Sequence, residues 1–268
     1  MNLLNQTNEP IIVADRITKL YPYRQKRKIR RGETIFSYFR KELEFGKQRN
    51  MFKALDNVSF SVYPGETVAI IGRNGSGKST LLRVLTGLTK PSEGVARVNA
   101  SFGELFSLNS GFDKNLTGRQ NIYLYAALKG TSRREIEKQV DAIIEFSELG
   151  EFIDQPIKTY SSGMRSRLGF SLTTAILPKV MFIDEALGTG DARFREKCDE
   201  RIKSMTRDES RTFVIVSHSM NNMRELCSRA IWLDRGVIQL DGEVNAVVDA
   251  YLDAFQIRKK PKKESLDG

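Results

Sequence analysis

The chain has 268 residues, 40% hydrophobic and 28% charged, which is enough for one large domain or two small ones with a buried core. The formal net charge is +10, and the basic excess lies in residues 1–50 and 256–268 because residues 51–255 are balanced. No stretch approaches the roughly 18 apolar residues that a membrane span needs, and residues 1–10 lack the pattern of a signal peptide. These features exclude an integral membrane protein and predict a soluble, cytoplasmic chain with an anionic partner, either a lipid surface or a nucleic acid.

The first part of the chain alternates between strand patterns and a basic segment. Residues 11–23 predict a strand that ends in aromatic residues, and residues 24–31 contain six Lys or Arg in eight positions. Residues 33–45 predict an amphipathic helix, after which the strand pattern resumes. Residues 24–50 are therefore predicted to be a basic, aromatic insertion, with a solvated charge run and a self-packed helix as the alternative.

The rest of the chain predicts an α/β fold. Residues 132–155 predict a helical segment, with Ile136, Val140, Ile143 and Ile144 at helical spacing. Residues 179–186 and 212–218 are short apolar runs, typical of parallel strands buried on both faces. Residues 230–242 predict a hairpin, and residues 256–268 a short, charged, disordered tail. Cys198 and Cys227 lack metal-ligand spacing and are predicted to be buried or semi-buried free thiols.

Residues 70–80, IIGRNGSGKST, contain the phosphate-loop pattern G-x-x-x-x-G-K-[ST] between a predicted strand and a predicted helix. Glycine lets backbone N–H groups converge on phosphate oxygens, and the helix start adds its positive dipole end. Lys78 supplies a charge for the β- and γ-phosphates, and the Ser79 hydroxyl suits Mg²⁺. The predicted nucleotide-binding residues of this loop are Gly72, Asn74, Gly75, Ser76, Gly77, Lys78, Ser79 and Thr80.

Polar residues also follow the two apolar strands. Asp184 and Glu185 end the first, where one carboxylate can hold Mg²⁺ and the next can polarise an attacking water. His218, the chain's single histidine, ends the second. Alone, such residues are usually solvated or structural; beside a phosphate loop they predict catalytic groups, because ligands bind at the carboxyl ends of parallel strands. Residues 160–164, YSSGM, predict a helix start capped by serine.

The order of these motifs resembles the ATP-binding subunits of ABC transporters. Residues 72–80 match the Walker A loop, residues 180–185 match Walker B with the catalytic glutamate, and His218 falls on the switch histidine. In residues 160–164 only Ser161 and Gly163 are identical to the signature Leu-Ser-Gly-Gly-Gln. Residues 188–191 fall on the D-loop and Tyr21 on the aromatic that stacks on adenine. No glutamine stands at the usual place after the strand following Walker A, where Glu104, Ser107, Leu108 and Asn109 are the nearby residues.

The resemblance implies a P-loop NTPase core over residues 1–255, a mostly parallel sheet with flanking helices and an antiparallel β part. It also implies an α-helical subdomain at about residues 105–177 that contains the signature. ATP and Mg²⁺ are the implied cofactors, with Ser79 and Asp184 at the metal. The implied catalytic residues are Lys78, Glu185 and His218, and the nucleotide contacts outside the loop are Tyr21, Ser161, Ser162, Gly163 and Asp191.

Within the family, residues 110–124, 145–171 and 184–198 resemble the exporters of O-antigen, capsule and teichoic acid, and residues 24–50 resemble their N-terminal gate insertion. The likeness implies a homodimer on the cytoplasmic face of the cell membrane, bound to two copies of a permease that contacts a lipid-linked glycan, with no nucleic-acid partner. The alternatives are a soluble ABC ATPase acting on ribosomes or nucleic acid, and an importer ATPase.

Overall fold

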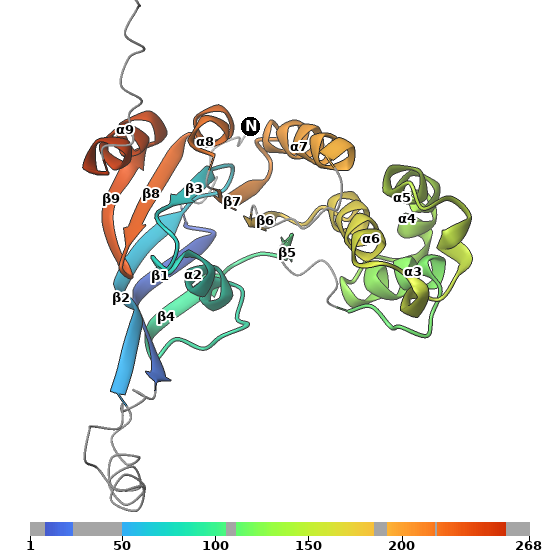
Figure 1. Cartoon of the computed structure of the whole chain (residues 1–268), viewed down its shortest axis with the longest axis horizontal. Coiled ribbons are helices and arrows are strands. Elements are labelled where there is room, and N and C mark those ends of the chain that lie inside the picture. The colour runs from blue at the N-terminus through green and yellow to red at the C-terminus, as the bar shows by residue number, and fades with distance from the viewer. Residues whose placement is uncertain (1–8, 24–49, 106–110, 185–191, 218, 256–268) are drawn as a thin grey trace, which may run out of the picture.

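The computed structural model describes residues 9–23, 50–105, 111–184, 192–217 and 219–255. Within these ranges the strands form two sheets, and helices cover both faces of the larger one (Figure 1). The strands are β1 Ile12–Tyr23, β2 Asn50–Val62, β3 Thr67–Ile71, β4 Glu93–Val98, β5 Phe102–Glu104, β6 Val180–Asp184, β7 Thr212–Val216, β8 Arg229–Asp234 and β9 Val237–Glu243. The helices are α2 Lys78–Leu85, α3 Gly118–Leu128, α4 Arg133–Glu137, α5 Val140–Ser147, α6 Ser162–Ala175, α7 Ala192–Thr206, α8 Met220–Leu226 and α9 Val244–Ala254, with 3₁₀ turns η1 Gly150–Asp154 and η2 Ile157–Thr159.

The larger sheet has the strand order β5-β6-β7-β3-β8-β9, and all its neighbours are parallel except the antiparallel pair β8–β9. The smaller sheet, β2-β1-β4, is antiparallel. The strands predicted at residues 11–23, 179–186 and 212–218 and the hairpin at 230–242 are thereby confirmed as β1, β6, β7 and β8–β9. A parallel sheet with helices on both faces and an antiparallel part confirms the predicted fold class.

Alternate residues of the central strands enter two separate cores. In β3, Ala69 and Ile71 pack among the helices α6 to α9, whereas Val68 and Ile70 pack against α2 and the smaller sheet. The strands β6 and β7 divide in the same way. This period of two follows from the pleat of a β-strand and explains why these strands are apolar throughout.

The helices α3 to α6 form a layer with its own apolar core, which includes Ile122, Ile143 and Leu168. The helical segment predicted at residues 132–155 is not continuous here: α4 ends at Glu137, α5 begins at Val140, and η1 follows. Lys138 and Gln139 turn the chain, so that Ile136 of α4 and Val140 of α5 both reach this core. The helix predicted at residues 33–45 and the tail 256–268 lie outside the described residues.

Both cysteines lie in the described part of the chain, are buried and form no disulfide. Burial raises the pKa of the Cys227 thiol to about 12, so it stays protonated and unreactive at neutral pH. The prediction of buried free thiols at both positions is therefore confirmed.

Candidate functional site

The phosphate loop leaves the end of β3 and enters α2 through a backbone that requires glycine. Gly72, Gly75 and Gly77 have positive φ angles of 153°, 79° and 110°. A Cβ at Gly72 would overlap the Leu233 carbonyl oxygen, and one at Gly77 would lie 2.7 Å from the Ala54 carbonyl oxygen. A Cβ at Gly75 would have no atom of the described residues within 4 Å, so among these residues nothing covers this part of the loop.

The polar groups of this loop fit a phosphate. The Lys78 ammonium donates to the carbonyl oxygens of Gly72, at 2.6 Å, and Arg73, at 3.0 Å, so it lies inside the curve of the loop. The Ser76 hydroxyl is buried and has no hydrogen-bond partner among the described residues. The α2 N-terminus begins after Gly77 with no side-chain cap from the described residues. Uncapped helical N–H groups, an ammonium and an orphaned hydroxyl together form an anion site.

The turn between β8 and β9 supports this loop through backbone hydrogen bonds. The Gly236 N–H donates to the Ser76 carbonyl oxygen at 2.8 Å, and the Gly236 carbonyl oxygen accepts from the Asp56 N–H at 2.8 Å. Gly236 has a φ of 79°, and a Cβ there would lie 2.7 Å from the Ala54 carbonyl oxygen. Sequence reasoning missed this support, although Asp-Arg-Gly inside a predicted hairpin is a turn signal.

The carboxyl ends of three strands meet in one row beside the loop. Ile70 of β3 pairs with Val216 of β7, which in turn pairs with Asp184 of β6. Because Val180 and Phe182 pack on the α2 side of the sheet, strand alternation places Asp184 on that side too. Asp184 is half-buried on the α2 side of the sheet, and Ser79 is exposed in the first turn of α2 itself. The two predicted metal ligands therefore lie on the same side of the larger sheet. Glu185, Asp191 and His218 lie outside the described residues.

The remaining loop residues are accessible. Asn74 is exposed and Thr80 is half-buried. No group of three or more His, Cys, Asp or Glu in the described part of the chain forms a metal cluster. A cation bound at Ser79 and Asp184 would take further oxygen ligands from phosphate and water.

Tyr21 of β1 lies near the loop because its neighbouring strand, β2, approaches Gly77. It pairs with Phe52, and Ala54, two residues further along β2, has the carbonyl oxygen that approaches Gly77. Tyr21 is half-buried, and the Lys19 ammonium lies 5.1 Å from its ring centroid. This placement agrees with the predicted contact to adenine, which stays a prediction.

The signature residues lie apart from the loop of the same chain. Ser161 caps α6 by accepting a hydrogen bond from the Met164 N–H at 3.2 Å, and α6 belongs to the helical layer, away from α2 (Figure 1). Ser161 and Ser162 are exposed and Gly163 is half-buried. A donor set at an open helix N-terminus therefore faces outward, where a second molecule can reach it.

Tyr160 anchors this helix start. Its ring is buried and its hydroxyl donates to the Phe152 carbonyl oxygen at 2.6 Å. Burial raises the pKa of Tyr160 to about 12, so the phenol remains a donor at neutral pH. The aromatic residue at the first signature position thus fills the core of the helical layer rather than contacting a ligand.

We expect Gly72→Ala to weaken nucleotide binding about ten-fold and lower the free energy of unfolding by ~2–4 kcal/mol, because its methyl group overlaps a backbone carbonyl that cannot move cheaply. Gly87→Ala is the matched control: Gly87 has a φ of 75° but open space around it. Fluorescent-nucleotide titration and urea unfolding measure both effects. Equal losses of nucleotide affinity and stability in the two variants would contradict the close approach of Gly72 to the Leu233 carbonyl oxygen.

Comparisons with known proteins agree with this geometry. The family model described as ABC transporter matches residues 55–188. An O-antigen export system ATP-binding protein of Klebsiella pneumoniae is 38% identical over 247 residues, covering 92% of this chain and 99% of the relative. The chain belongs to the ABC transporter family. The resemblance stated from the motifs is confirmed.

Two further comparisons extend the match to this ABC transporter chain. A teichoic acids export ATP-binding protein of Enterococcus faecalis is 40% identical over 252 residues, covering 93% of this chain and 54% of the relative. A bacterial ABC transporter cassette solved as a dimer is 25% identical with a TM-score of 0.64, and the match covers 87% of this chain and 98% of the cassette. In the described part of the chain, no helix is long and apolar enough to cross a membrane.

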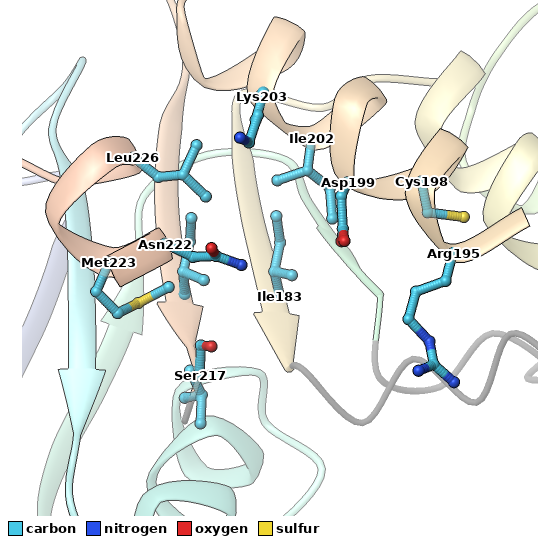
Figure 2. A pocket seen from close by; sticks show the side chains of 12 residues that line it. Ile183, Arg195, Cys198, Asp199, Ile202, Lys203, Ser217, Asn222, Met223 and Leu226 are labelled. Carbon is cyan, nitrogen blue, oxygen red and sulfur yellow. The ribbon is translucent and has the colours of Figure 1, made fainter. Parts of the chain in front are cut away.

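This ABC transporter chain also has a cavity of about 240 Å³ between α7 and α8, beside the ends of β6 and β7. In Figure 2 the Asn222 side chain of α8 points toward Ile183, and Asp199 lies across from it on α7. The described lining residues are Ile183, Arg195, Cys198, Asp199, Ile202, Lys203, Ile215, Val216, Ser217, Asn222, Met223 and Leu226. None of them belongs to the phosphate loop, so the cavity is not the predicted triphosphate site.

Proposed function

We propose that this chain is the ATP-hydrolysing subunit of an exporter that moves a lipid-linked polysaccharide, such as O-antigen, capsule or teichoic acid, across the cytoplasmic membrane. The observation that carries the chemistry is the phosphate loop, which combines three positive-φ glycines, the Lys78 ammonium and a buried Ser76 hydroxyl that has no hydrogen-bond partner among the described residues. Relatives named for O-antigen and teichoic acid export, matched over 92% and 93% of this chain, support the substrate class.

In this proposal each residue of the site has a separate role in ATP hydrolysis. The phosphate loop and Lys78 bind the β- and γ-phosphates of the substrate ATP and stabilise charge on the transferred group. Mg²⁺, when bound at Ser79 and Asp184, neutralises phosphate charge. Glu185 accepts the proton of the attacking water, and His218 contacts the γ-phosphate from the end of β7. Tyr21 stacks on adenine.

We propose that the working unit is a head-to-tail homodimer with two ATP molecules between the copies. Ser161, Ser162 and Gly163 lie at the N-terminus of α6, where both serines are exposed, so they suit the γ-phosphate bound by a second copy. Asp191 is proposed as a further nucleotide contact. The matched cassette, which was solved as a dimer and has a TM-score of 0.64, supports a dimer of this chain. ATP binding then joins the copies and hydrolysis releases them, which moves the attached permease.

We further propose that the subunit acts at the cytoplasmic face of the membrane, held there by a permease in two copies that contacts the glycan. Residues 24–50 would contact an anionic leaflet or the permease, each basic residue contributing ~1 kcal/mol at the surface. The importer and the ribosomal or nucleic-acid classes remain the alternatives, but the matched relatives are named for export.

The test is a strain that lacks the gene. The wild-type chain is expected to restore polysaccharide at the cell surface, whereas the Ser161→Arg variant is expected to leave lipid-linked glycan inside the cell. Surface staining and extraction of lipid-linked glycan from the inner leaflet measure the two pools. Normal surface glycan in the deleted strain, or ATPase activity that RNA stimulates several-fold without a membrane protein, would overturn export as the function.

A further inference from the structure

Three aromatic residues form a cluster between β8 and the end of α9. The ring centroids of Trp232 and Tyr251 lie 5.7 Å apart, those of Trp232 and Phe255 6.0 Å apart, and those of Tyr251 and Phe255 5.2 Å apart, all edge to face. Phe255 follows the last residue of α9 and is half-buried. The cluster therefore fixes where the C-terminal end of this helix lies.

The same ring touches the phosphate loop. The guanidinium carbon of Arg73 lies 5.2 Å from the Phe255 centroid, within the range of a cation–π interaction. Arg73 is the second residue of the loop, and its carbonyl oxygen is one of the two acceptors that hold the Lys78 ammonium. Burial raises the pKa of Tyr251, and the nearby Arg73 charge opposes that rise.

The α9 helix is itself held firmly. Val247 and Val248 are fully buried in the core that covers the larger sheet. Arg224 of α8 donates to Asp249 and to Asn245 of α9, both at 2.9 Å. α8 begins at Met220, two residues after the predicted switch histidine His218. The α9 helix therefore contacts the helix that follows this histidine, and Phe255, directly after α9, contacts the phosphate loop.

We propose that Phe255 is a positioning residue for nucleotide binding, acting through Arg73 to hold the phosphate loop in the shape that receives ATP. This inference rests on the proposed ATPase function. Loosening the loop weakens ground-state and transition-state binding alike, so it changes the KM for ATP and leaves kcat nearly constant. An exposed cation–π interaction corresponds to about a two- to five-fold change in affinity.

The experiment compares Phe255→Leu with Phe255→Tyr in the full chain. Leucine keeps apolar volume without a π face, and tyrosine restores the face. Phe255→Leu is expected to raise the KM for ATP about two- to five-fold with kcat within two-fold, and Phe255→Tyr to restore the KM. Phe152→Leu, at a phenylalanine that is 57% exposed, is the matched control and should leave both constants unchanged.

A double-mutant cycle with Arg73→Met isolates the pair. If Phe255 acts through Arg73, adding Arg73→Met to Phe255→Leu weakens fluorescent-ATP binding no further than either change alone. Additive losses, or a Phe255→Leu effect that tyrosine does not rescue, would overturn the positioning role and leave only packing. Fluorescent-ATP binding by a wild-type chain that does not hydrolyse ATP would contradict the proposed function instead, and would leave this cycle interpretable.

Discussion

Replacing Lys78 with methionine is expected to lower ATP turnover by about 10²–10³-fold, the cost of removing one preorganised charge from an oxyanion site. Lys78 is 6% exposed and its ammonium donates to the carbonyl oxygens of Gly72 and Arg73, so the charge is held inside the loop that is proposed to bind the β- and γ-phosphates. Methionine keeps the length and the apolar stem and removes only the charge and its donors. Steady-state phosphate release measures the effect.

Lys90→Met is the matched control, because Lys90 is exposed and lies outside the loop. It should hydrolyse ATP at the wild-type rate. The carbonyl oxygens of Gly72 and Arg73 lose a hydrogen-bond partner when Lys78 changes, which can lower stability. Circular dichroism and thermal unfolding of both variants therefore show whether a loss of turnover comes from the missing charge or from unfolding. A folded Lys78→Met variant with turnover within three-fold of wild type, roughly half a decade, would remove Lys78 from its proposed role.

Replacing Glu185 with glutamine is expected to slow turnover by about 10²–10⁴-fold while nucleotide binding is retained, because an amide cannot accept the proton of the attacking water. Glu185 directly follows Asp184, whose strand ends in the row that includes Ile70 of β3. Slow hydrolysis should also trap two chains around ATP. Light scattering with and without ATP and Mg²⁺ should then show a dimer that the wild type forms only briefly.

Two further variants complete this test. Glu145→Gln changes an exposed carboxylate of α5 and should leave turnover and mass unchanged. Adding Ser161→Arg to Glu185→Gln should abolish the ATP-dependent dimer, because the bulky charge would block the α6 start that the proposed head-to-tail dimer places against the partner. A dimer that forms equally well with Ser161→Arg would contradict the head-to-tail arrangement, and turnover near the wild-type rate in Glu185→Gln would remove that residue from catalysis.

The parts of the fold that could be predicted from the sequence are those with a short-range signal. The apolar runs that became β6 and β7 need no partner to be recognised, because burial on both faces excludes polar residues from them. The glycines at 72, 75 and 77 are equally local, since each stands where the backbone has a positive φ. Asp184 could be placed near the loop because parallel strands bring their carboxyl ends to one edge.

The contacts that could not be predicted join residues far apart in the chain. No sequence pattern at Arg73 or Phe255 predicts that the two residues touch, because their contact depends on how α9 packs on β8. Gly236 supports Ser76 only after the β8–β9 turn has folded behind the loop. The break between α4 and α5 also could not be predicted, because the spacing of Ile136 and Val140 fits a single continuous helix.

The pairing of Ile70, Val216 and Asp184 across adjacent strands also limits where the sequence can tolerate insertions and deletions. In a pleated strand a single inserted or deleted residue moves every later side chain to the opposite face, so an indel in β7 would turn Val216 away from the α2 side of the sheet. Length variation among homologous sequences should therefore be confined to the surface connections, such as the turn at Lys129–Gly130 between α3 and α4, and be absent from β3, β6 and β7.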